Sequence, residues 1–253
     1  MTQDRAGTPA KPGKASQGET HKDKAAPAAA SAKPEIAAFL DAVRARAPVA
    51  AGGRGRLVFA LDATMSRQPT WDSACALQAD MFREAAASGG LDIQLVYFRG
   101  LEECRASSWV SDGERLAGLM RRIDCRGGHT QLRKVLRHVA NESRQRKVQA
   151  LVFVGDAMEE KIDDICAAAG ELGLIGVPAF MFQEGGDPVA ENAYREVARL
   201  TRGAYSRFDA GSARQLGELL RAVAAYAAGG KAALAALSQR QGAGARHLLQ
   251  QLS

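Results

Sequence analysis

Three short polar segments hold the residue types from which an oxygen-coordinated metal site is built. They are Asp62-Ala63-Thr64-Met65-Ser66, Gly127-Gly128-His129-Thr130 and Gly155-Asp156. The first and third follow the apolar runs 57–61 and 151–154, which are typical of strands buried on both faces of a parallel sheet. Asp62 and Asp156 are then expected at strand carboxyl ends, where ligands of open α/β sheets bind. The sequence therefore predicts that the two aspartates share one site.

The rest of the chain supplies the alternating elements that such a site needs. Apolar patterning predicts strands over 56–62, 92–98, 106–110, 148–154, 177–182 and 204–208, and helices over 70–87, 112–123, 131–146, 161–172, 189–201 and 212–228. We expect 106–110 to pair with 92–98 across a turn that contains Gly100. This order predicts an α/β fold, a doubly wound, mostly parallel, Rossmann-like sheet flanked by helices, with one antiparallel edge strand.

The 253 residues are expected to form one such domain, at 56–228, between extensions. Residues 1–34 are a basic tail rich in Ala, Pro and Lys that we expect to be disordered, because it has almost no large apolar side chains to bury. Residues 35–55 are predicted to form a helical arm and linker. Residues 229–253 are predicted to form a C-terminal helical extension.

We infer the cellular setting from the lack of a recognisable secretory or membrane-spanning segment. The first residues lack the apolar core of a secretory signal, and no apolar run approaches the roughly 18 to 20 residues of a membrane helix. The cysteines are scattered singly, without a CxxC pair, which is typical of reduced thiols: Cys75, Cys104, Cys125 and Cys166. We therefore expect a cytoplasmic protein that does not enter a membrane.

Taken together, the three polar segments resemble the metal-ion-dependent adhesion site (MIDAS) of von Willebrand factor A (VWA) domains. Residues 62–66 resemble the Asp-x-Ser-x-Ser motif of that family, residues 127–132 its Gly-Gly-x-Thr-x-Leu segment, and Asp156 its final aspartate after a buried strand. The resemblance spans about residues 56–228. Two residues depart from the pattern: Thr64 replaces the usual Ser but keeps the hydroxyl, and Met65 replaces a frequent Gly, which we expect to crowd the loop.

The resemblance implies a metal ion held by Asp62, Thr64, Ser66 and Thr130, with Asp156 bound directly or through water. Mg²⁺ suits these ligands because it prefers oxygen and releases water reluctantly; Mn²⁺ or Ca²⁺ are the alternatives. One carboxylate, with hydroxyls and waters, leaves the ion incompletely neutralised, so it would attract an Asp or Glu of a protein partner. Intracellular members of the family often work with ATPase or chaperone-like partners, and we expect a partner of that class and no enzymatic activity.

Two other functions compete with this hypothesis. Residues 154–159 also resemble the acidic motif of haloacid dehalogenase-like phosphatases, in which Asp62 would be the nucleophile. Against this, Thr64 stands where most of those enzymes have a second acid, and the Gly127–Leu132 segment has no place in their pattern. The basic residues between Arg121 and Lys147 suggest a nucleic-acid scaffold, but no aromatic residues interleave with them, so we expect a solvated helix face instead.

Overall fold

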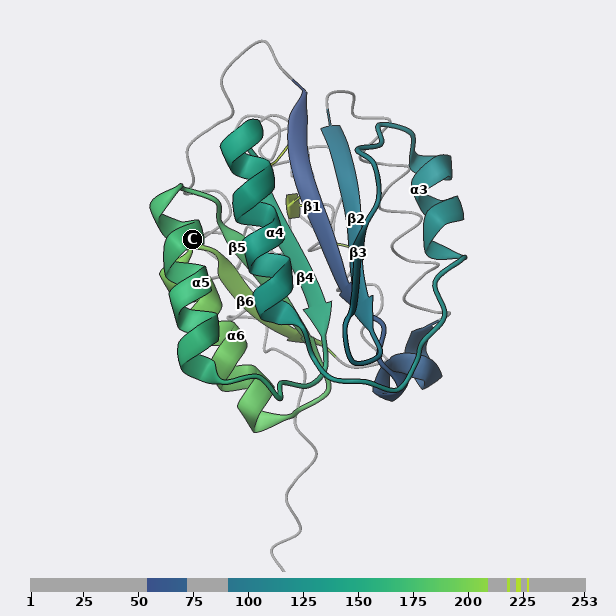
Figure 1. Cartoon of the computed structure of the whole chain (residues 1–253), viewed down its shortest axis with the longest axis vertical. Helices are drawn as coiled ribbons and strands as arrows, with labels where there is room; N and C mark the ends of the chain where they lie inside the picture. The colour runs from purple at the N-terminus through teal and green to yellow at the C-terminus, as the bar shows by residue number, and fades with distance from the viewer. Residues whose placement is uncertain (1–53, 72–90, 209–217, 219–221, 224–226, 228–253) are drawn as a thin grey trace, which may run out of the picture.

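The computed structural model describes residues 54–71 and 91–208, together with 218, 222, 223 and 227 (Figure 1). Within these ranges the strands form one sheet in the order β3-β2-β1-β4-β5-β6. The strands are β1 Gly55–Asp62, β2 Leu91–Arg99, β3 Glu103–Ala106, β4 Ala150–Gly155, β5 Ala179–Glu184 and β6 Ala204–Phe208. Neighbouring strands are parallel except β2 and β3, so β3 is an antiparallel edge strand.

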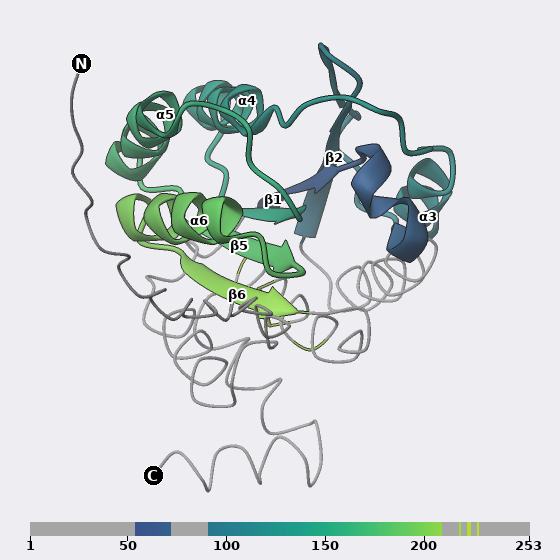
Figure 2. The ribbon, with the colours of Figure 1, turned by 90° about the horizontal axis from the view of Figure 1, so that it is seen from below.

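Helices cover both faces of this sheet (Figure 2). They are α3 Gly113–Met120, α4 Leu132–Gln145, α5 Ile162–Leu174 and α6 Pro188–Leu200, with a 3-10 helix η1 at Met65–Thr70. Val58 and Ala60 of β1 pack in a cluster with α4, α5 and α6, whereas Leu57 and Phe59 pack with α3 and residues 222, 223 and 227. This division follows from the strand geometry, because successive side chains point to opposite faces. No helix in the described ranges is long and apolar enough to cross a lipid bilayer.

The central strands are fully buried, which explains their apolar composition. Every residue of β1 and of β4 is buried, as expected for parallel strands covered by helices on both faces. Short polar side chains begin two of the helices: Asp112 accepts a bond from the Arg115 N–H, and Asp187 accepts one from the Ala190 N–H. These local signals set the α/β alternation that brings strand ends and helix starts together at one edge.

The predicted fold class is confirmed, with strand and helix ends displaced by one to three residues for most elements. The antiparallel strand was misplaced: β3 covers 103–106 rather than 106–110, and Val110 forms only an isolated bridge with Ile93. The reason is a tight turn in which Gly100 adopts φ 63°, so that Glu103 pairs with Arg99.

Some predicted elements lie wholly or partly outside the described residues. Of the helix predicted over 70–87, only two residues are described: Thr70 ends the 3-10 helix η1, which was not predicted, and Trp71 is helical. In the helix predicted over 212–228, residues 218, 222, 223 and 227 are helical. The tail at 1–34, nearly all of the arm at 35–55 and the extension at 229–253 fall outside and stay predictions.

Candidate metal centre

The two aspartates lie at the carboxyl ends of adjacent parallel strands. Asp62 is the last residue of β1, and Asp156 directly follows β4, whose Val154 pairs with Leu61. Asp62 is fully buried and Asp156 is half-buried. Burial is the main cause that raises the pKa of Asp62, and the negative charge of Asp156 adds to it, so the two carboxyl groups interact electrostatically. The structure thus brings both predicted acids to one edge of the sheet.

The loop after β1 bonds to Asp62 through Thr64 and brings two hydroxyls together. The Thr64 N–H donates to Asp62 Oδ1 at 2.8 Å, and Thr64 Oγ1 lies 3.1 Å from Ser66 Oγ. Thr64 is buried, whereas Ser66, in the first turn of η1, is exposed. Met65 was expected to crowd this loop, but 53% of its surface is exposed, so its side chain extends to solvent. The loop therefore offers one inner and one outer hydroxyl.

Thr130 is fixed to the segment that follows Asp156. Its Oγ1 accepts a bond from the Glu159 N–H at 3.0 Å, while its own N–H donates to Glu159 Oε2 at 2.9 Å. The loop that carries Thr130 also contacts β1, because the Arg126 N–H donates to the Ala63 carbonyl at 3.0 Å. Segments far apart in sequence, around Thr64, Thr130 and Asp156, are thus joined by direct hydrogen bonds at one edge of the sheet.

Two glycines of the predicted motifs permit close backbone approach. A Cβ on Gly128 would lie 2.0 Å from the Gly100 carbonyl oxygen, and a Cβ on Gly155 would lie 2.7 Å from the Tyr194 hydroxyl. Both distances are shorter than any real Cβ contact. The requirement for Gly at these positions is therefore steric: a larger residue would push the 127–130 loop away from the β2–β3 turn or displace Asp156.

Two buried carboxylate oxygens at this edge have no hydrogen-bond partner in the described structure, Asp62 Oδ2 and Asp156 Oδ1. Burial, the largest effect, raises the pKa of Asp62 to about 6, although its hydrogen bonds from Thr64 oppose this. Unpaired buried carboxylate oxygens are costly and suit a cation. The described residues hold no cluster of three or more His, Cys, Asp or Glu side chains that could bind a metal, so hydroxyls and waters would complete the coordination.

A buried ion pair lies beside the aspartates. Arg67 is 1% exposed, and its Nε lies 3.0 Å from Glu184 Oε2 at the end of β5. The Arg67 charge lowers the pKa of Asp62 only as the smallest of five effects. This pair could not be predicted from the sequence, because nothing in the local pattern indicates that Arg67 is buried.

Glu159 and Glu160 serve as capping groups for the loop and for α4. Glu159 binds the Thr130 N–H, and Glu160 accepts bonds from the N–H groups of Leu132 and Arg133. The residue before α4, Gln131, makes no side-chain cap bond, so acids from another loop satisfy the free N–H groups. In the sequence, this role is indicated only by two adjacent acids that begin four residues after β4. The sequence does not show that their partner is α4.

Solved structures of VWA domains share this fold. No protein-family model matches the chain, and no curated protein sequence matches it. The VWA domain of SpRpn10 is similar with a TM-score of 0.53 and 10% identity, over 68% of this chain and 94% of that chain. The vWF domain of the type V pili tip protein Mfa5 from Porphyromonas gingivalis is similar with a TM-score of 0.54 and 12% identity, over 67% and 93%.

A third structure carries a metal. Proximal thread matrix protein 1 from the mussel byssus, with a zinc-occupied MIDAS motif, is similar with a TM-score of 0.52 and 13% identity, over 68% of this chain. The match covers 46% of that chain, so this chain spans about half of its length. At these identities the likeness concerns the fold. With the strand order and the single antiparallel edge strand, it shows that the chain has the fold of a von Willebrand factor A domain.

Proposed function

We propose that this chain is a protein-interaction module that binds a divalent cation, Mg²⁺ in the first instance, at the edge formed by β1 and β4. The observation that carries the proposal is the pair of buried, unpartnered oxygens, Asp62 Oδ2 and Asp156 Oδ1. Thr64, Ser66 and Thr130 are the hydroxyl ligands that we assign to the same ion. Hard divalent cations prefer such an all-oxygen set, and Mn²⁺ or Ca²⁺ are acceptable replacements.

The bound ion would supply positive charge to hold an acidic side chain from outside. With one aspartate bound directly and the other through water, and with uncharged hydroxyls as the remaining ligands, the divalent ion would keep part of its positive charge. An Asp or Glu of a protein partner is the ligand that such an ion would accept. The MIDAS of the mussel protein is occupied by zinc, which agrees with a divalent ion in this type of site. We also propose a cytoplasmic setting and an ATPase or chaperone-like partner.

The position two residues after Asp62 disfavours the phosphatase alternative. Most enzymes of that kind place a second acid there as the general acid and base that assists the nucleophilic aspartate. In this chain that position holds a threonine whose hydroxyl lies beside Ser66. A binding role without catalysis fits this arrangement better.

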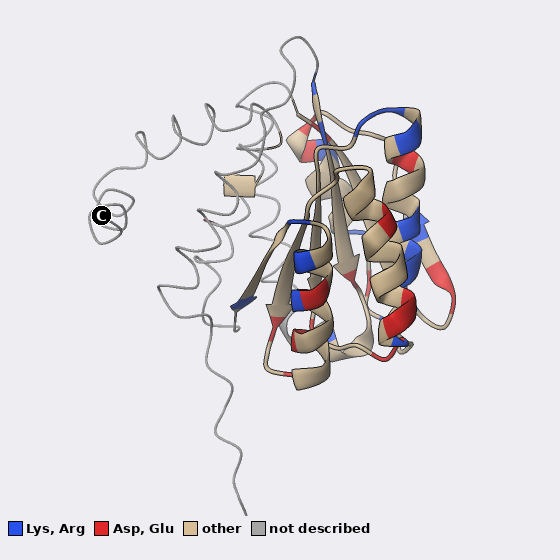
Figure 3. Cartoon of the chain, turned by 90° about the vertical axis from the view of Figure 1, so that its left-hand side faces the viewer, with Lys and Arg blue, Asp and Glu red and all other residues tan. Residues whose placement is uncertain are grey.

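The contacts of the basic residues disfavour the nucleic-acid alternative. Arg133 pairs with Asp164 at 3.3 Å, Arg126 pairs with Asp124 at 3.1 Å, and Lys147 donates to the Ile175 and Gly176 carbonyls. Figure 3 shows acidic and basic residues interspersed along the helices. Part of the positive charge of this region is therefore paired with local acids on a solvated surface.

The test is metal-dependent stabilisation of chelator-stripped protein. Thermal unfolding is followed with and without Mg²⁺, Mn²⁺ or Ca²⁺ for the wild type, for Asp62→Asn, and for Asp163→Asn as a control in the exposed first turn of α5. A ligand at about 100 times its dissociation constant should stabilise the wild type and the control by about 2.7 kcal/mol, and Asp62→Asn by much less. A wild type that responds to none of the three ions at 10 mM would refute the metal site.

Two further assays separate the function classes. Capture of a partner that requires Mg²⁺ and is lost in Asp62→Asn supports the binding module. Hydrolysis of p-nitrophenyl phosphate that is lost in the same variant would instead support the phosphatase. Binding to DNA that falls steeply with salt and is unaffected by Asp62→Asn would support the nucleic-acid scaffold.

A further inference from the structure

Thr130 reaches the candidate site on a loop that has little regular structure of its own. Residues 121–131 join α3 to α4 and form only an isolated bridge, between Arg126 and Thr64. A metal ligand on such a loop is effective only if other contacts hold the loop in place, since affinity depends on the groups that orient the ligands.

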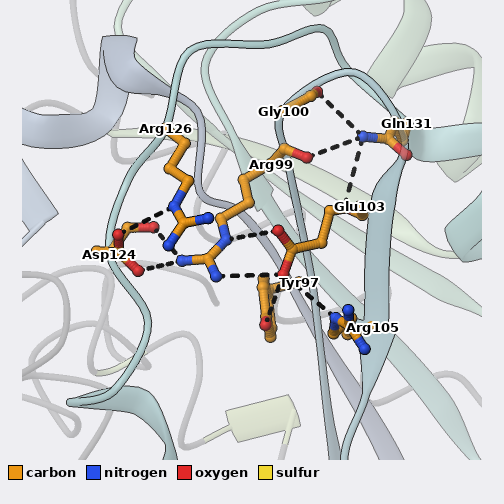
Figure 4. Close-up of polar contacts among 8 residues, drawn as sticks. All are labelled: Tyr97, Arg99, Gly100, Glu103, Arg105, Asp124, Arg126 and Gln131. Carbon is orange, nitrogen blue, oxygen red and sulfur yellow. Dashed lines mark hydrogen bonds and ion pairs between the residues drawn. The ribbon is translucent and has the colours of Figure 1, made fainter.

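Arg99, the last residue of β2, binds this loop and the β2–β3 turn at the same time. Its Nε and Nη2 donate to the two oxygens of the Glu103 carboxylate at 3.0 and 3.2 Å. Its Nη1 donates to the Asp124 carbonyl oxygen at 2.9 Å and also to the Asp124 carboxylate. Figure 4 shows the guanidinium of Arg99 between these two acids. Arg126 lies beside it and donates to the same Asp124 carboxylate, whereas Tyr97 and Arg105 donate to the Glu103 carboxylate.

The other end of the loop is attached to the same turn. Gln131 is 4% exposed, and its Nε2 lies 3.3 Å from both the Arg99 and the Gly100 carbonyl oxygens (Figure 4). The His129 N–H also donates to the Gly100 carbonyl, at 3.2 Å. Thr130 is therefore bracketed by contacts to the end of β2, with Asp124 on one side and Gln131 on the other.

Arg99 makes the charged contacts of this arrangement. It is 8% exposed, and its hydrogen bonds are the main cause of the lowered pKa of Glu103. The pKa of Asp124 is lowered chiefly by the hydrogen bond from Arg126 and further by that from Arg99, so both acids stay ionised. Charge-assisted, two-pronged arginine contacts are stronger and more directional than neutral hydrogen bonds. The amide contacts of Gln131 are neutral and long by comparison. Loss of Arg99 should thus loosen the loop while Gln131 keeps it near the site.

We propose that Arg99 is a positioning residue that sets the metal affinity of the site by fixing the loop that carries Thr130. This inference rests on the proposed metal-binding function. Groups that orient metal ligands typically change affinity by about 10 to 100-fold when removed. Since Arg99 acts through one ligand, the lower end of that range applies.

The first test is Mg²⁺ affinity by calorimetry for the wild type, Arg99→Met and Arg99→Lys. Arg99→Met should bind Mg²⁺ about 10-fold more weakly than the wild type. Arg99→Lys keeps the positive charge but lacks the planar guanidinium that donates to two acceptors, so its affinity should lie between those of Arg99→Met and the wild type. The matched control is Arg105→Met, because Arg105 donates to the same Glu103 carboxylate at 3.3 Å from an exposed position and has no contact with the loop in Figure 4. Equal affinity of Arg99→Met and the wild type would overturn the proposal.

A double-mutant cycle with Thr130→Ala distinguishes positioning from a general loss of structure. If Arg99 acts through Thr130, Arg99→Met should cause less than a twofold further loss of affinity in the Thr130→Ala background. Effects that multiply fully in the double variant would show that Arg99 acts by another route.

Hydrogen exchange of the metal-free protein tests the positioning role without using metal. The backbone amides of Arg126 and His129, which bond to Ala63 and Gly100, should exchange at least several-fold faster in Arg99→Met than in the wild type or Arg105→Met. Unchanged exchange would refute the positioning role. A wild type that binds no metal would refute the proposed function and with it the affinity claim, so the two failures are distinguishable.

Discussion

The substitution Asp62→Asn should stabilise the metal-free protein while it destroys the metal site. Asn keeps the size of Asp62 and an Oδ1 acceptor for the Thr64 N–H, but it removes a carboxylate that is fully buried beside Asp156. Burial raises the pKa of Asp62 from 3.8 to about 6, a difference of roughly two pH units. At about 1.4 kcal/mol per unit, the ionised carboxylate destabilises the apo protein at neutral pH by up to about 3 kcal/mol.

The pH dependence has a definite sign. Because the folded-state pKa is raised, folded Asp62 binds its proton more tightly than the unfolded chain does, so its contribution to the free energy of unfolding falls as pH rises from about 4 to about 6. The advantage of Asp62→Asn in chelator should therefore be small near pH 4 and reach its full value by pH 7. Protons and metal compete for the same carboxylate, so metal affinity of the wild type should weaken as pH falls below about 6.

Urea unfolding in EDTA, followed by the fluorescence of Trp71 and Trp109, measures this difference at pH 4.5 and 7.5. Trp71 is 5% exposed and donates its Nε1–H to the Ile123 carbonyl, so its emission should report unfolding. The control Asp163→Asn removes an exposed acid from the start of α5 and should change stability by less than about 1 kcal/mol. If Asp62→Asn were less stable than the wild type in EDTA at pH 7.5, the desolvation argument would be wrong.

The positions of the two aspartates were predictable because a strand buried on both faces has an almost wholly apolar sequence. β1 and β4 are apolar over nearly their whole length, and the first polar residue after each run falls at the strand end by necessity. Parallel neighbours then place these ends at one edge. The edge strand β3 has no such apolar run, because Glu103 bonds to Arg99 and Arg105, and Arg105 is exposed.

The contacts that hold the site were hidden because they join residues distant in sequence. Glu160 caps α4 from about 28 residues away in sequence. Arg67 pairs with Glu184 only because folding places the end of β5 near the loop after β1. A local pattern shows that an acid follows a strand, but the identity of its partner depends on how the loops pack. Hydroxyl ligands such as Thr130 could be predicted only because the three polar segments occur together in a fixed order, since a single threonine at a helix start is more often a cap.

Two further substitutions test the packing around the site. Gly128→Ala should destabilise the protein by at least about 1 to 3 kcal/mol in urea unfolding and weaken metal binding, because its Cβ would lie 2.0 Å from the Gly100 carbonyl oxygen. Gly127→Ala is the matched control, since a Cβ there meets nothing within 4 Å, and equal effects of the two would contradict the steric argument. Arg67→Met should cost about 3 to 5 kcal/mol, because it leaves the Glu184 carboxylate without its buried partner. The exposed ion pair of Arg199 with Glu196 provides the comparison, and Arg199→Met should cost less than about 1 kcal/mol. A loss in Arg67→Met no larger than in Arg199→Met would mean that Glu184 finds another partner or water, and that the charge beside Asp62 is less enclosed than its burial indicates.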